Sequence, residues 1–183
     1  MNNNKHKTKL IAISGTSGGG KSTTVTELQK RTPNSKTLSI EDGDYEKNSG
    51  ITDLGQWEED GWDVSLWNLQ SLADDISLLM QENLEYIFFD YPFGYMQKQI
   101  SGFISLSVFL DTPLDIALAR RLLRDNKSKS TAAIMEELEW YLEKRHLFTL
   151  SNDKQREDAE LIIDGSLPVD DICNLILERV KMI

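Results

Sequence analysis

The stretch Gly15-Thr-Ser-Gly-Gly-Gly-Lys21-Ser22 constrains the fold of this chain more than any other. A glycine, four residues and then Gly-Lys-Ser form the spacing of a phosphate-binding loop. Glycines let the backbone curl so that its N–H groups converge on an anion, and a helix beginning there adds its positive end. The apolar run Leu10–Ser14 precedes the loop, and a helix-compatible segment follows it. We therefore expect a nucleotide to be bound by Gly15, Thr16, Ser17, Gly18, Gly19, Gly20, Lys21, Ser22 and Thr23.

The residue types in this loop suggest the ligand ATP with Mg²⁺. A lysine at position 21 would reach the β- and γ-phosphates, and the hydroxyl of Ser22 would bind the magnesium ion. Such sites also need an acid, and Asp90 ends the apolar run Tyr86–Asp90. Ligands of open α/β sheets bind at the carboxyl ends of the strands. Asp90 is therefore a candidate metal residue, and the alternative is an acid that ends a strand without any ligand.

Strand-like and helix-like segments alternate along the chain. The five apolar runs that predict strands are Leu10–Ser14, Thr37–Glu41, Tyr86–Asp90, Ser105–Asp111 and Glu160–Asp164. Helical patterns cover Val64–Glu82, Thr112–Asp125, Thr131–Phe148 and Pro168–Met182. Alternation of this kind is typical of α/β proteins with a parallel sheet. We expect a three-layer P-loop NTPase fold, with five parallel strands and helices on both faces, as one domain over 9–183 after a disordered leader (1–8).

Composition excludes several classes of partner. The chain has 183 residues and a formal net charge of −10. General binding to nucleic acid or to an anionic membrane surface needs clustered Lys and Arg, so neither is expected. No apolar run approaches the ~20 residues that span a bilayer. Cys173 is the only cysteine, which excludes an internal disulfide and indicates the cytoplasm.

The negative charge is concentrated in residues 41–90, which hold fourteen acidic residues and one lysine. An acceptor lobe would follow the second strand, so an anionic acceptor would be repelled there, and a neutral or cationic one is favoured. The alternative is a solvated acidic surface. Aromatic residues gather in and after the same stretch: Tyr45, Trp57, Trp62, Trp67, Tyr91, Phe93 and Tyr95. Their rings would either stack on a base or sugar, which favours a nucleoside, or form the core of a small subdomain.

Two further groups of charged residues are candidates for chemistry. Asp42 or Asp44, after the second strand, would accept the proton of an attacking hydroxyl, unless they only form an acidic turn around Gly43. Arg120, Arg121 and Arg124 end a helix before the loop 126–130, which we expect to be mobile. Arginines on a closing lid (120–131) neutralise a transferring phosphoryl group. The alternative is that they only complement the helix dipole.

These motifs together resemble the uridine kinase group of P-loop kinases, over most of the chain from about Lys9. Besides the phosphate loop, the resemblance rests on Leu38-Ser-Ile-Glu-Asp42-Gly-Asp-Tyr45, Trp57-Glu-Glu-Asp-Gly-Trp-Asp63, Val108–Asp125 and Ala159–Ser166. It implies that Asp42 is the base and that 42–68 is the acceptor segment. It also implies that the lid arginines assist transfer and that the loop around Gly165 borders the adenine. Residues expected at the acceptor are Asp42, Tyr45, Trp57, Asp63, Tyr91 and Phe93.

The resulting hypothesis is an ATP-dependent kinase for a hydroxyl of a small neutral acceptor, with a nucleoside first. Catalysis is assigned to Asp42, Lys21, Arg120, Arg121 and Arg124. Two alternatives remain at this point. One is a P-loop kinase for another small metabolite, such as a vitamin or a sugar. The other is a nucleotide-binding regulatory protein without catalysis.

Overall fold

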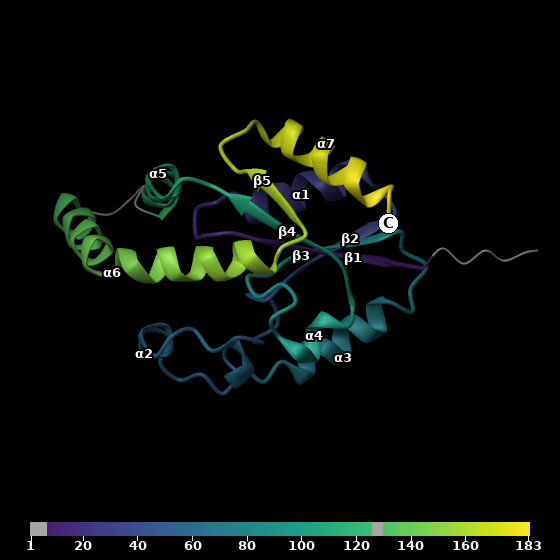
Figure 1. Cartoon of the computed structure of the whole chain (residues 1–183), viewed down its shortest axis with the longest axis horizontal. Coiled ribbons are helices and arrows are strands. Elements are labelled where there is room, and N and C mark those ends of the chain that lie inside the picture. The colour runs from purple at the N-terminus through teal and green to yellow at the C-terminus, as the bar shows by residue number, and fades with distance from the viewer. Residues whose placement is uncertain (1–6, 126–129) are drawn as a thin grey trace, which may run out of the picture.

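A parallel sheet lies between two helical layers in the computed structural model, which describes residues 7–125 and 130–183 (Figure 1). The strands are β1 (Lys9–Ser14), β2 (Ser35–Ser39), β3 (Tyr86–Asp90), β4 (Ile104–Asp111) and β5 (Leu161–Asp164). They form one sheet in the order β2-β3-β1-β4-β5, and every neighbouring pair is parallel. The predicted fold class is confirmed. The strand order places β1 and its loop at the centre of the sheet.

Successive side chains of the central strands point to opposite faces of the sheet and pack into two separate hydrophobic cores. In β1, Ile11 and Ile13 join one core, whereas Leu10 and Ala12 join the other. Strand β3 is buried along its whole length, which explains its continuous apolar sequence. Both faces of the sheet are therefore covered.

The helices divide between these faces. Helices α1 (Lys21–Arg31) and α7 (Val169–Val180) cover one face (Figure 1). On the other side lie α2 (Leu54–Glu59), α3 (Gln70–Leu79) and α4 (Lys98–Ser101). Helix α5 (Leu114–Asp125) leads to the long helix α6 (Thr131–Asp158), which returns along the sheet to β5. The two helices α2 and α4, of six and four residues, have no predicted counterpart, because they are too short for a clear periodicity.

The second strand, expected over Thr37–Glu41, begins and ends two residues earlier, and two predicted helices differ more from the structure than the others. The segment expected as one helix over Val64–Glu82 is a short 3₁₀ helix (Val64–Leu66) followed by α3. Between them Trp67 adopts extended backbone angles and is buried, so packing of its ring overrides the helical periodicity. The helix expected over Thr131–Phe148 continues ten residues further, to Asp158.

The ends of the predicted domain also differ from expectation. Thr8, assigned to the leader, is buried, and its hydroxyl donates to the Leu84 carbonyl at 2.9 Å. The rest of the leader up to residue 6, and 126–129 of the expected mobile loop and lid, lie outside the described residues. Ser130 caps α6 by accepting a hydrogen bond from the Ala133 N–H.

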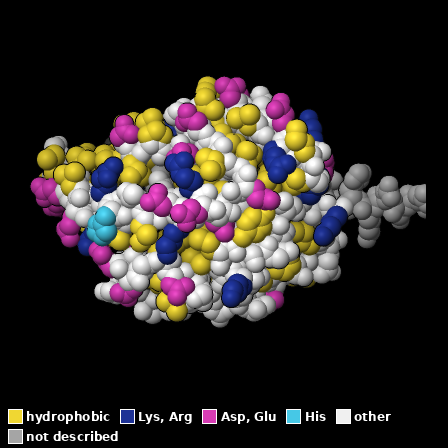
Figure 2. Space-filling view, in the orientation of Figure 1, with side chains coloured by type: hydrophobic (Ala, Val, Ile, Leu, Met, Phe, Trp, Pro, Cys, Tyr) yellow, Lys and Arg dark blue, Asp and Glu magenta, His cyan; other side chains and the backbone are white. Residues whose placement is uncertain are grey.

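The surface carries both signs of charge. Figure 2 shows basic and acidic side chains interspersed over the face in view, with apolar side chains scattered between them. In the described part of the chain, no helix has both the length and the apolar character that crossing a membrane requires.

Candidate active site

The phosphate loop joins the end of β1 to the start of α1 at the centre of the sheet. Gly18 has a φ of 82°, and Gly20, the residue before α1, has a φ of 99°. Residues other than glycine rarely adopt these backbone angles. A Cβ atom on Gly18 would lie 2.2 Å from the carbonyl oxygen of Ala117 in α5. The loop therefore rests directly on α5. No acidic side chain occupies the first turn of α1, so its positive end is free for an anion.

Two buried side chains hold this loop from outside it. The Gly15 N–H donates to Oε1 of Gln155 in α6 at 2.8 Å, and the Thr112 hydroxyl donates to the Gly19 carbonyl at 2.8 Å. Gln155 is itself oriented by its amide N–H, which donates to the hydroxyl of Ser151 at 2.7 Å. No local sequence pattern points to Thr112 or Gln155, because only the tertiary fold brings them to the loop.

A cavity of about 690 Å³, which we call the nucleotide cavity, opens at the phosphate loop. Its cationic lining comes from Lys21 and from Arg120 and Arg124 of α5. Its apolar lining comes from Leu167, Val169 and Ile172, after β5. A lining with both cations and apolar side chains suits the phosphates and the base of a nucleotide. Gly165, expected beside the adenine, also lines this cavity, and its carbonyl accepts a hydrogen bond from Arg120.

Ser22 and Asp90 form the candidate metal site. The Ser22 hydroxyl donates to Oδ2 of Asp90 at 2.6 Å, and Asp90 is buried. Magnesium prefers oxygen ligands and keeps several of its waters, so this pair of oxygen donors beside the phosphate loop fits Mg²⁺. The described residues contain no group of three or more His, Cys, Asp or Glu arranged for a metal. Phosphate oxygens and water would therefore supply the other ligands.

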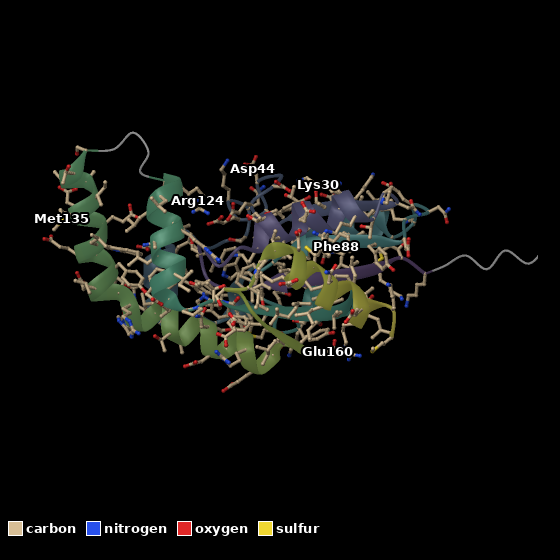
Figure 3. All side chains as sticks on the ribbon, turned by 90° about the horizontal axis from the view of Figure 1, so that it is seen from above. Lys30, Asp44, Phe88, Arg124, Met135 and Glu160 are labelled. Carbon is tan, nitrogen blue, oxygen red and sulfur yellow. The ribbon has the colours of Figure 1, made fainter. Side chains whose placement is uncertain are left out.

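The three predicted lid arginines have different surroundings. Arg120 lines the nucleotide cavity and donates to the Gly165 carbonyl at 3.0 Å. Arg124 also lines it and hydrogen bonds to Asp125; Figure 3 shows it on the same side of the molecule as Asp44. Arg121 does not line this cavity. Its buried guanidinium lies 3.4 Å from a Glu137 oxygen and packs against aromatic rings of α6.

A second cavity, of about 370 Å³, adjoins the first. Ser17, Lys21 and Glu41 line both cavities, so the two meet there. Aromatic side chains form most of its apolar lining: Trp57, Trp62, Trp67, Phe93, Trp140 and Phe148. We call it the acceptor cavity, since it lies beside the position expected for the γ-phosphate. Arg121 does not line this cavity either.

Only part of the predicted acceptor set reaches this cavity. Trp57 and Phe93 line it, but Asp42, Asp63 and Tyr91 do not. The Asp42 carboxylate accepts the Ser39 N–H at 3.1 Å and so closes the turn after β2. Asp63 caps the 3₁₀ helix by accepting the Ser65 N–H, and Tyr91 is fully buried and stacked on Phe89.

Glu41 is a cavity residue that was not predicted from the sequence. It follows Ile40, which is buried, and its side chain lines both cavities. The resemblance of the segment Leu38–Tyr45 rests on Asp42 and Tyr45, so it predicted a role for those two residues and none for Glu41. Residues 40 and 41 lie in the turn after β2, where no strand or helix periodicity predicts which side chain faces a cavity, so no local signal points to Glu41.

Tyr45, another expected acceptor residue, is part of the core. Its hydroxyl donates to Oδ2 of Asp75 in α3 at 2.5 Å. Burial first, and then this hydrogen bond, raise the pKa of Tyr45 to about 12. The side chain is thus neutral at physiological pH and ties the loop after β2 to α3.

Tyr45→Phe is expected to lower the free energy of unfolding by about 1–2 kcal/mol, because the hydrogen bond to a carboxylate is lost. ATP affinity and the KM for an acceptor should stay unchanged. Urea unfolding and steady-state kinetics of both proteins measure this. A rise in acceptor KM without loss of stability would place Tyr45 in the acceptor site instead.

The fold and the loop define the class: this is a P-loop protein with the fold of small-molecule kinases. The chain belongs to the family described as "AAA domain", whose model matches residues 11–142. It is 27% identical to a uridine kinase of Borrelia turicatae over 179 residues, 85% of each chain.

Solved structures show the same fold at low sequence identity. A shikimate kinase from Aquifex aeolicus superposes with a TM-score of 0.53 at 19% identity, covering 94% of this chain and 96% of that one. A deoxyadenosine kinase from M. mycoides has a TM-score of 0.51 at 20% identity, with coverages of 95% and 100%. These two neighbours are kinases for different acceptors, so the likeness establishes the fold alone.

Proposed function

We propose that this protein is an ATP- and Mg²⁺-dependent kinase that phosphorylates a hydroxyl group of a small acceptor carrying no anionic group. One observation carries the proposal: the nucleotide cavity and the acceptor cavity meet at Lys21 and Glu41. A hydroxyl in the second cavity would therefore face the terminal phosphate of a nucleotide in the first.

In this proposal, each residue of the junction has a separate task. Lys21 and the N–H groups of the loop and of α1 bind the phosphates, and Arg120 and Arg124 neutralise charge that develops on the transferring group. Ser22 and Asp90 would hold Mg²⁺, which would withdraw charge from the phosphate groups.

Glu41 is the proposed base. The acceptor oxygen forms a bond to the γ-phosphorus while the bond from that phosphorus to the β,γ-bridging oxygen breaks, and ADP leaves. The hydroxyl proton passes to the Glu41 carboxylate. Glu41 is preferred to Asp42 and Asp44, because Asp42 closes a turn and Asp44 pairs with Lys47.

The lining of the acceptor cavity supports an acceptor without negative charge. It contains Glu41, Glu46 and Glu58, and Lys21 is its only basic side chain among the described residues. A nucleoside is the first candidate, since its base can stack on indole rings and since the chain resembles a uridine kinase. A vitamin or sugar with a free hydroxyl is the second.

A coupled assay of ADP release over nucleosides, vitamins, sugars and amino alcohols tests the proposal. At least one acceptor should raise ADP release well above the rate with ATP and Mg²⁺ alone. Phosphoester formation, seen by ³¹P NMR, excludes simple ATP hydrolysis. ATP binding without transfer to any of these compounds would favour a nucleotide-binding regulatory protein.

A further inference from the structure

Aromatic rings surround the acceptor cavity from two directions. Trp57, Trp62, Trp67 and Phe93 contact one another with ring centroids 4.9–6.1 Å apart. Most of these pairs meet at interplanar angles of 65–75°, so the ring faces are turned in different directions. Trp140 and Phe148 of α6 complete the lining, and we call these six residues the aromatic cage. Such cages bind cations, because the face of each ring carries partial negative charge.

Three carboxylates lie in the same cavity. Glu41, Glu46 and Glu58 line it, and their side chains form no hydrogen bond or ion pair within the described residues, although the charge of Glu41 helps to raise the pKa of Arg124. Glu58 is half-buried beside the tryptophans, and this burial, followed by the charge of Glu59, raises its pKa. A carboxylate that is desolvated without a counter-ion costs free energy, which a bound cation would offset.

The protein's own cations do not supply that counter-ion. Lys144 pairs with Glu59 at 2.7 Å, on the neighbouring position of α2. Lys154 donates to the Gly61 carbonyl at 2.6 Å. The Arg121 guanidinium lies beside Glu137 and over the outer cage rings, 5.8 Å from the Trp140 centroid and 5.3 Å from the Phe148 centroid, so the cation site of the cage is the cluster of Trp57, Trp62, Trp67 and Phe93. None of these three cations lines the cavity. Lys21 does, but ATP phosphates would neutralise it.

A buried polar group of the aromatic cage also lacks a partner. The indole N–H of Trp67, a cage residue that is 5% exposed, donates to no atom of the described residues. Buried N–H groups are normally satisfied, so this donor is left for a bound molecule or an ordered water.

We infer that the acceptor is a cationic alcohol, with its ammonium group in the aromatic cage near Glu58 and its hydroxyl at Glu41. This inference rests on the proposed kinase function, and within that function it places a cationic alcohol ahead of the nucleoside named above. Glu41 lies where the two cavities meet, and Glu58 lines only the acceptor cavity, so the two ends of the acceptor are assigned by position. An uncharged nucleoside would leave the Glu58 carboxylate without a counter-ion.

Choline and 3,3-dimethylbutan-1-ol test the inference, since they have the same shape and differ by one positive charge. Quenching of tryptophan fluorescence measures their binding to the full chain with ADP and Mg²⁺. Cation–π contacts predict at least about tenfold tighter binding of choline. Equal affinities, or preference for the uncharged alcohol, would overturn the inference.

Two variants of adjacent residues locate the effect. Glu58→Gln should reduce the preference for choline several-fold. Glu59→Gln removes the same charge from the neighbouring position but should leave the preference unchanged, because Glu59 pairs with Lys144 and His146 outside the cavity. An equal loss in both variants would show general electrostatics and contradict the placement of the ammonium group.

Failure of this inference is distinguishable from failure of the kinase proposal. Selective binding of choline without phosphoryl transfer to any acceptor would keep the cation site and contradict the kinase. Efficient transfer to an uncharged nucleoside, with no preference for a cation, would keep the kinase and contradict the cation site.

Discussion

Glu41→Gln is expected to lower the turnover number for phosphoryl transfer by about 10²-fold or more, with little change in the affinity for ATP. Glutamine keeps the size of the side chain but cannot accept the proton of the acceptor hydroxyl, and general-base catalysis typically contributes 10²–10⁴-fold. Steady-state rates of ADP release at saturating acceptor measure the turnover, and titration with a fluorescent ATP analogue measures nucleotide affinity.

Asp42→Asn is the matched control for this prediction. It removes the same charge from the next residue, whose carboxylate accepts a backbone N–H and lines neither cavity. Turnover should fall far less than in Glu41→Gln. A large loss in Asp42→Asn with normal turnover in Glu41→Gln would return the base to Asp42, as the resemblance to uridine kinases implies.

Gly18→Ala is expected to weaken ATP binding by roughly tenfold or more. An alanine at a left-handed backbone position costs about 1–2 kcal/mol, and 1.4 kcal/mol corresponds to tenfold. The new Cβ would also lie 2.2 Å from the Ala117 carbonyl, so the loop or α5 must move. Since the loop N–H groups bind the phosphates, a moved loop binds them less well.

Gly102→Ala serves as the control for the backbone change. Gly102 ends α4 with right-handed backbone angles, and a Cβ there meets nothing within 4 Å. ATP affinity by calorimetry and thermal stability should match the original protein. Unchanged ATP affinity in Gly18→Ala would contradict the role of this loop as the phosphate site.

Much of the fold follows from local sequence. The five strands were predicted because buried parallel strands are continuous apolar runs, and the phosphate loop because its chemistry fixes residue types at fixed spacing. Both signals are local. The break at Trp67 was not predicted, because a buried ring there overrides the helical periodicity that continues through it.

The candidate site divides in the same way. The nucleotide half was predictable from Gly15–Ser22, and the structure brings Ser22 and Asp90 together across 68 residues. The acceptor half was not, because charge and aromatic content do not tell which side chain faces a cavity. Tyr45 and Glu41 lie four residues apart, yet Tyr45 is buried against α3 and Glu41 faces both cavities.

Helix α6 gives the two halves of the site a common mechanical support. At 1.5 Å per residue, its 28 residues give a length of about 42 Å along an axis that bends, as Figures 1 and 3 show. Along that length it contributes Trp140, Phe148 and Ser151 to the acceptor cavity, and Gln155 then holds the Gly15 N–H. A movement of this one helix would therefore change the width of the acceptor cavity and the shape of the phosphate loop at the same time.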